Sequence, residues 1–237
     1  MLRKAKLTVA QVENMLNTFD FSQLPKPGKN KGLRGNLLES ALGIKNSSDL
    51  IDMTDESFID DIEKANKIFL KEMGYIPTIF SYPFGEYSKF MKDYISKNFE
   101  FAFGQHSGVI DINKNKFELP RFPINENYGE LKRFQSIISS FPLEYKSLLP
   151  LEKYLTKKNN PPEFIVEFFE DQINLENINC YSNEDGKWKK SKTTMSNRKL
   201  TIQFRAPFKP RRGRINCSLN DNGKWRWFGV QFPIKEN

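Results

Sequence analysis

Histidine and cysteine are almost absent from this chain of 237 residues, which holds one histidine and two cysteines. One histidine excludes any metal site that needs two histidine ligands from a single copy of the chain. Cys180 and Cys217 are too few for a disulfide framework or a cysteine metal cage. They occupy equivalent places in an internal repeat, which fits either a disulfide or two buried thiols. We expect thiols, because the sequence shows no export signal.

Long apolar runs are lacking as well. A membrane-spanning helix needs roughly 20 consecutive apolar residues, and no stretch approaches this length. The residues Met1–Lys6 carry charges with no apolar segment after them, so they do not read as a secretory signal. We therefore expect a cytoplasmic protein without a membrane partner. Hydrophobic residues make up 38% of the chain and aromatic residues 14%, which is enough for folded cores.

The charge balance is basic. The chain has 37 Lys and Arg against 29 Asp and Glu, a formal net charge of +8. Much of the excess lies between Lys187 and Arg214, so we expect a local basic patch rather than a uniformly charged surface. Weak binding of nucleic acid through this basic surface is one consequence.

The stretch Phe80-Ser81-Tyr82-Pro83-Phe84-Gly85-Glu86-Tyr87-Ser88 organises the middle of the chain. An apolar run (Ile76–Phe80) predicts a strand before it, and Lys89–Lys97 has a helical pattern after it. Ser88 stands where it would cap that helix. In α/β folds, the loop after the carboxyl end of a strand is where sites are usually built.

Other patterns extend this α/β segment. Apolar residues from Phe58 to Met73 recur at helical spacing, with Thr54 as N-cap and Gly74 at the end. Three further elements are predicted by the same reasoning. They are a short strand over Phe99–Phe103, another over Val109–Ile112 and an amphipathic helix over Leu131–Ser140.

Three motifs carry a family resemblance. Tyr-Pro-Phe-Gly-Glu-Tyr-Ser, then Phe101-Ala102-Phe103-Gly104, then Leu119-Pro120-Arg121-Phe122-Pro123 resemble the second half of a polysaccharide deacetylase domain of the NodB type. The resemblance covers about Ser57 to Phe134. It implies an α/β fold, a partial distorted β/α barrel, for residues 55–155. It also implies hydrolysis of N-acetyl groups on amino-sugar polymers, and therefore a glycan partner.

The resemblance also implies site residues. Family members hold a divalent metal, typically zinc, with one aspartate and two histidines. The half of the domain that supplies this set has no counterpart here, so we expect no cofactor in this chain. The resemblance implies a backbone amide next to Tyr82 as oxyanion donor, a role for Arg121, and a substrate-binding wall of Pro83, Gly85 and Glu86. His106 is the candidate acid, and the alternative is a turn histidine that hydrogen-bonds the backbone.

The first 54 residues show a different resemblance. A short helix is predicted over Val9–Leu16, and Asn30–Gly43 opens a second helix with the pattern Lys-Gly-x-x-Gly-x-Leu-Leu-Glu. This pattern resembles the opening of a MutH-type DNA nicking endonuclease. The resemblance implies acidic site residues at Glu39 and at Asp49 or Asp52. The Glu-x-Lys pair of that family does not follow, so the metal site lacks its lysine.

Both motif sets are interrupted near residues 53–57, where they meet. A fused reading frame explains both interruptions together, and domain shuffling is the alternative. We expect three segments: 1–54 (MutH-like, helical), 55–155 (partial deacetylase domain) and 160–237 (an all-β sandwich).

The last segment follows a linker at Asn159–Pro162. In it Ile178-Asn179-Cys180 and a following Asp185-Gly186-Lys187-Trp188 recur as Ile215-Asn216-Cys217 and Asn222-Gly223-Lys224-Trp225. Both Asp-Gly and Asn-Gly are strong hairpin turns, so two equivalent hairpins are predicted. Further strands are predicted over Phe164–Phe169, Leu200–Phe204 and Trp227–Phe232, which together indicate a β-sandwich.

Trp188 and Trp225 stand among basic residues. Sugar rings stack on tryptophan faces, and nucleic acid binds the same mixture of rings and positive charge. Burial of alternate aromatics in the sandwich core is the ordinary alternative. Three functions follow in order of preference: a polysaccharide deacetylase-like protein, a DNA-binding or DNA-nicking protein, and a non-catalytic glycan-binding protein.

Overall fold

The computed structural model describes residues 55–111, 113–126, 128–172, 174–209 and 211–234. All of them belong to one compact unit. The predicted N-terminal helices, the cap Thr54 and the nuclease-like residues Glu39, Asp49 and Asp52 lie outside the described residues. Within the described ranges, no helix combines the length and the apolar character needed to cross a membrane.

The first described helix, α4, runs from Asp55 to Met73. Its apolar stripe buries Phe58 and Ile62, and acidic residues occupy the first turn, where the helix dipole favours them. Gly74 ends the helix in a left-handed conformation (φ 76°), and its amide donates to the carbonyl of Leu70 at 3.0 Å. The predicted helix and its glycine end are confirmed.

The central motif forms the expected strand, loop and helix. Strand β1 (Ile79–Ser81) leads through a short 3-10 turn, η2 (Pro83–Gly85), into helix α5 (Lys89–Asn98). Ser88 caps α5, since its Oγ accepts from the amide of Met91 at 3.1 Å. Strand β2 (Phe101–Phe103) follows and pairs with β1 in parallel, with Ile79 opposite Phe101. A parallel bridge between Phe103 and Leu119 extends this arrangement.

An aromatic cluster holds the α/β part together. Rings from α4, β1, α5 and the segments that flank η2 and follow α5 meet edge to face or tilted, at centroid separations of 4.5 to 6.4 Å. The buried members are Phe58, Ile62, Tyr82, Tyr87, Met91, Ile95, Phe99 and Ala102. This cluster is separate from the core of the β-sheets.

The segment after β2 differs from expectation in one place. The predicted helix is present as α6 (Leu131–Ile138), but the predicted strand at Val109–Ile112 is wrong, because Val109–Asp111 form no strand. A turn begins immediately at Asp111, whose carboxylate accepts from the amide of Asn113 at 2.9 Å. Three residues before a turn give too short a run for strand pairing.

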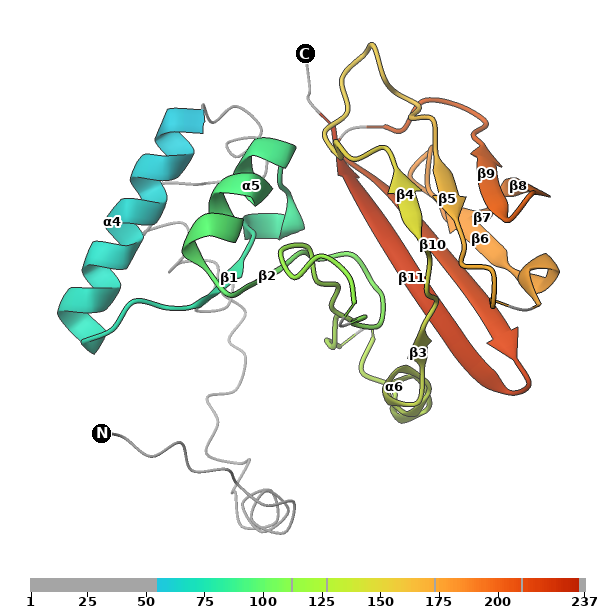
Figure 1. The fold of residues 1–237 in the computed structure, drawn as a ribbon, viewed down its shortest axis with the longest axis horizontal. Helices are drawn as coiled ribbons and strands as arrows, with labels where there is room; N and C mark the ends of the chain where they lie inside the picture. The colour runs from blue at the N-terminus through green and yellow to red at the C-terminus, as the bar shows by residue number, and fades with distance from the viewer. Residues whose placement is uncertain (1–54, 112, 127, 173, 210, 235–237) are drawn as a thin grey trace, which may run out of the picture. The chain divides into compact units, whose positions relative to one another are not determined.

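Two antiparallel-rich sheets form the rest of the described chain (Figure 1). The five-stranded sheet has the order β3-β11-β10-β6-β7, and the four-stranded sheet has the order β4-β5-β9-β8. The strands are β3 (Phe141–Pro142), β4 (Ser147–Leu149), β5 (Ile165–Glu167), β6 (Asn179–Ser182), β7 (Lys189–Lys190), β8 (Lys192–Ser196), β9 (Lys199–Gln203), β10 (Arg212–Asp221) and β11 (Lys224–Pro233). A 3-10 turn, η3 (Leu175–Asn177), precedes β6.

Buried residues of the two sheets belong to one core cluster. Burial alternates along β10, so that Ile215, Cys217 and Leu219 are fully buried. They join Val166 of β5 and Leu200 of β9 in a single buried cluster. The described chain is therefore a mixed α/β part followed by a β-rich part. A barrel is not shown, since β1 and β2 form a sheet of two strands.

The β-rich part begins earlier than the sequence predicts. Strand β3 pairs with β11, and β4 pairs with β5, although both lie in the segment assigned to the α/β domain. Leu143 and Leu155 are buried in the sandwich core. The boundary expected at Asn159–Pro162 is thus a loop inside the β-rich part. Strands of two or three residues are too short to give a readable alternation of apolar and polar positions.

The internal repeat is reproduced in the pairing of the strands. In the first hairpin Tyr181 lies opposite Lys190, and in the second Ser218 lies opposite Trp227. Each residue of the second pair lies 37 positions after its counterpart in the first pair, and the two cysteines have the same sequence separation of 37. The predicted equivalence of the hairpins is confirmed in register. Because β10 and β6 are adjacent and antiparallel, a local twofold relates the hairpins.

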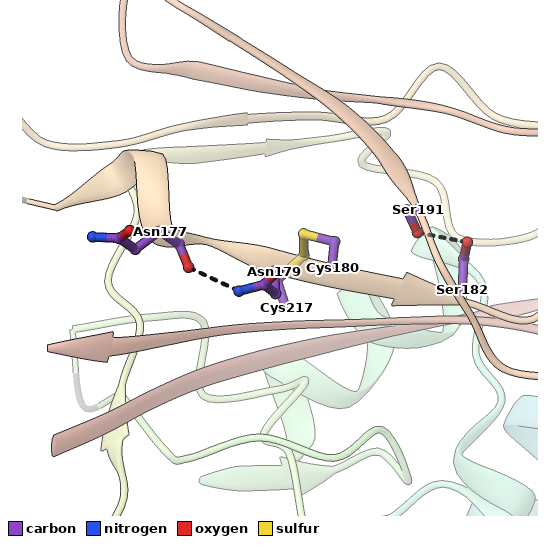
Figure 2. Close-up of a disulfide and its surroundings, with 6 residues drawn as sticks. All are labelled: Asn177, Asn179, Cys180, Ser182, Ser191 and Cys217. Carbon is purple, nitrogen blue, oxygen red and sulfur yellow. Dashed lines mark hydrogen bonds between the residues drawn. A yellow bond between two sulfur atoms is a disulfide. The ribbon is translucent and has the colours of Figure 1, made fainter. Parts of the chain in front are cut away.

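Cys180 and Cys217 form a disulfide, so the expected thiols are wrong (Figure 2). The two residues lie directly opposite each other on β6 and β10, and both side chains are buried. Nearby, Ser182 and Ser191 share a buried hydrogen bond of 2.7 Å between their hydroxyls. The sequence marks the cysteines as equivalent, but only the pairing of β6 with β10 brings their side chains together.

Candidate functional site

The three motifs that carry the family resemblance meet at one edge of the parallel strands. The amide of Tyr82, just after β1, donates to the carbonyl of Phe103 at 3.0 Å. Gly104, just after β2, donates to Leu119 at 2.9 Å. The carboxyl ends of neighbouring parallel strands lie at the same edge, which is where α/β folds build sites. This edge is called the motif edge below.

Tyr82 does not have the role expected of it. Its backbone amide is already bound to Phe103, so it is not free to stabilise an oxyanion. The side chain is 1% exposed, and its hydroxyl donates to the carbonyl of Phe117 at 3.0 Å. Burial raises the pKa of Tyr82 far above its usual value. Tyr82 is a core residue that fixes the loop after β1.

The loop after Tyr82 is buried against β11. Phe84 and Gly85 both have positive φ (55° and 69°). Their carbonyls accept from Gln231 Nε2 at 3.1 and 3.3 Å. Pro83 and Gly85 are buried, so the expected substrate wall is a packed contact with the sandwich.

Glu86 is likewise withdrawn from the surface. It is 3% exposed, and its Oε1 accepts from Arg212 Nε of β10 at 2.5 Å. Its Oε2 is buried and has no hydrogen-bond partner among the described residues. Burial raises the pKa of Glu86 above its usual value, although the adjacent Arg212 opposes the shift. Glu86 joins the two parts of the chain and does not face a ligand.

Arg121 and Ser81 remain at the surface of the motif edge. Arg121 Nη1 donates to Ser81 Oγ at 3.2 Å in an exposed hydrogen bond. The Arg121 amide donates to the carbonyl of His106 at 3.0 Å. This bond is made by the main-chain carbonyl of His106 and does not involve its imidazole.

The two tryptophans do not share a site. Trp188 and Trp225 are 46% and 45% exposed, each next to a hairpin turn. Since β6 and β10 run antiparallel, their turns lie at opposite ends of the five-stranded sheet. The structure therefore gives two separate half-exposed rings and no common stacking platform.

His106 contributes to a cavity of about 310 Å³ that sequence reasoning did not predict. Residues of the motif edge, of the segment from β3 to Lys153 and of β11 line it. Its charged lining residues are Lys92, Asp111, Lys114, Glu118, Lys146 and Lys153. No residue pattern in the sequence points to this cavity, because its walls come from segments as far apart as Tyr87 and Gln231.

Glu118 organises one wall of the cavity. It accepts from the Tyr87 hydroxyl at 3.3 Å and from Lys92 Nζ at 2.8 Å. His106 lies nearby, and burial lowers its pKa to about 4 although Glu118 opposes the shift. The imidazole is therefore neutral at pH 7 and is a poor proton donor, which argues against His106 as a general acid.

Lys153 also lines the cavity and is 7% exposed. Its Nζ donates to the carbonyl of Pro150. Burial lowers the pKa of Lys153 to about 8, with Lys92 acting in the same direction and Glu118 against it. The group is still predominantly protonated at pH 7.

The lining does not fit the zinc site of the resembling family. Glu118 is already bound by Lys92 and Tyr87, and two ammonium groups would repel a cation. In the part of the chain that the structure describes, no three His, Cys, Asp or Glu side chains are grouped as metal ligands.

Comparisons with known protein families, with curated proteins and with solved structures found no match for this chain.

Proposed function

We propose that the chain is a polysaccharide deacetylase-type protein of carbohydrate metabolism that binds amino-sugar glycans at the motif edge. One observation supports this best. The three motifs that carry the resemblance, separated by up to 40 residues, lie on adjacent parallel segments with their carboxyl ends together. A chance likeness of three short motifs would not require them to be neighbours in space.

The exposed pair of Ser81 and Arg121 is the proposed contact for the sugar. A guanidinium presents several N–H donors in a fixed plane, which suits hydroxyl and acetyl oxygens. The Arg121 side chain is exposed and its guanidinium already donates to the Ser81 hydroxyl, so the pair presents polar groups at the surface of the motif edge. Glycan binding there would leave the buried loop and Glu86 undisturbed.

The same geometry favours binding over hydrolysis. Deacetylation in the resembling family needs a metal and a general acid. The sequence has one histidine, and that histidine is neutral at pH 7. We therefore expect no metal-dependent release of acetate from chito-oligosaccharides by this chain. Acetate release that a chelator abolishes would contradict binding as the sole function.

Calorimetric titration with the hexamer of N-acetylglucosamine tests the proposal. Binding is expected, and Arg121→Ala should weaken it at least about fivefold, a change of about 1 kcal/mol for one lost hydrogen-bonding group. Arg198→Ala removes an arginine of the β8–β9 turn and is the matched control. No binding of the hexamer, or equal weakening by both variants, would refute a glycan site at the motif edge.

The nucleic-acid alternative has less support. Lys189, Lys190 and Lys192 lie on β7 and β8, which are the outer strands of the two sheets. Lysine on an edge strand prevents pairing with other chains, so these charges have a structural reason that needs no ligand. The acidic residues of the nuclease resemblance lie outside the described residues.

A further inference from the structure

Lys153 holds a positive charge inside the protein without a carboxylate in hydrogen-bonding contact. Its ammonium group donates to the neutral carbonyl of Pro150. Lysine is rarely buried unless it is paired, because desolvation of an ammonium is costly. One backbone carbonyl uses one of its three N–H donors.

The other lysines of the cavity already have acidic neighbours. The pairs are Lys92 with Glu118 at 2.8 Å, Lys146 with Glu167 at 3.2 Å and Lys114 with the interacting Asp111. The lining itself contains four lysines and two carboxylates, Asp111 and Glu118, so it is positively charged. The described lining therefore complements an anionic ligand.

The remaining walls are apolar and aromatic. Phe228 is buried, and the half-buried ring of Tyr145 packs against it at 5.3 Å between centroids. Trp227 also lines the cavity, and its buried indole nitrogen has no acceptor among the described residues. Ligand sites of proteins are mostly apolar with a few placed polar groups and begin at volumes of roughly 300 Å³. The cavity has this composition and size.

We propose that this cavity binds a small organic carboxylate, no larger than a monosaccharide acid, with Lys153 as its counter-ion. A carboxylate would place a negative charge beside Lys153 and accept hydrogen bonds from the N–H donors that the Pro150 carbonyl does not use. The inference does not depend on the proposed glycan function, because Lys153, Tyr145 and Phe228 lie outside the segment that carries the family resemblance.

Thermal melting of the full chain with lactate, gluconate and D-glucuronate tests this assignment. D-glucose is the matched neutral control, since it differs from glucuronate only in bearing CH₂OH in place of the carboxylate. At least one carboxylate should raise the melting temperature by about 3 °C near ten times its Kd, and glucose should not. This comparison needs no variant.

Lys153→Met then locates the site. The substitution keeps an unbranched side chain that is one atom shorter, removes the buried charge and should leave the protein at least as stable as before. Carboxylate affinity, measured by calorimetry, should fall at least about tenfold. Lys89→Met, which removes an exposed lysine that is paired with Asp93 and does not line the cavity, should change it little. The proposal would be overturned if none of the three acids raised the melting temperature. It would also be overturned if Lys153→Met bound the carboxylate as tightly as the unchanged protein, or if glucose 6-phosphate bound and the three acids did not.

Discussion

Glu86 and Arg212 are 126 residues apart in the sequence and are joined by an ion pair of 2.5 Å in which the glutamate side chain is 2% exposed. The guanidinium of Arg212 also lies 5.4 Å from the centroid of the Phe84 ring. Gln231 of β11 adds hydrogen bonds to the same loop. The loop that resembles a substrate wall is therefore the joint between the α/β part and the sandwich, and the two parts are expected to unfold together.

Removal of Arg212 tests this joint. Arg212→Leu would leave the Glu86 carboxylate buried and uncompensated, which should lower the free energy of unfolding by about 3 kcal/mol. Urea denaturation followed by circular dichroism and by tryptophan fluorescence measures the change. The matched control is Lys146→Met, which breaks a more exposed pair with Glu167 and should cost about 0–1 kcal/mol. Similar costs for the two variants would contradict a structural role for the Glu86–Arg212 pair.

Gly85 is expected to be intolerant of a side chain. Its φ is +69°, and a Cβ would collide with the backbone and side chain of Gln105. Gly74 has a similar φ of +76° but open space around it. Gly74→Ala should therefore cost about 1–2 kcal/mol for the left-handed conformation alone, while Gly85→Ala should cost clearly more. The difference in the urea midpoint between the two variants isolates the steric term, and equal costs would show that the loop can move away from Gln105.

Local signals in the sequence predicted local structure well. Ser88 before an amphipathic run gave the start of α5, and Asn222-Gly223 gave the β10–β11 turn, where both residues have positive φ. Contacts between residues that are distant in the sequence could not be predicted from it. The motif around Glu86 predicted a substrate wall. Its actual partner, Arg212, is 126 residues away and meets Glu86 only when β10 has formed. Lys153 was missed altogether, since nothing in its neighbourhood in the sequence distinguishes it from a surface lysine.

The disulfide should contribute to the stability of the sandwich. It closes a loop between β6 and β10 with a sequence separation of 37 residues. A disulfide of this kind contributes about 2–4 kcal/mol, mainly by restricting the unfolded chain. The protein should therefore denature at lower urea concentration in the presence of a reductant. The double variant Cys180→Ala/Cys217→Ala should be less stable and insensitive to reductant. A reductant effect of equal size on this variant would show that the sensitivity does not come from the disulfide.

His106 should make stability depend on pH in the acidic range. Burial lowers its pKa to about 4 in the folded protein, while the unfolded chain retains a value near 6.5. Between these values the unfolded state binds the proton and the folded state does not. Stability should thus be complete above pH 6.5, decline as the pH falls towards 4 and level off below, with a loss of at most about 3 kcal/mol from this group.

His106→Gln, which does not titrate, isolates this contribution. The free energy of unfolding of both proteins is measured in urea at pH 7.0, 5.5 and 4.5. Carboxylates titrate in both proteins alike, so the difference between the two pH profiles belongs to His106. The wild type should lose stability more steeply than the variant over this range. Parallel profiles would mean that the imidazole reaches solvent when protonated, and that the wall of the cavity next to Glu118 opens at acidic pH.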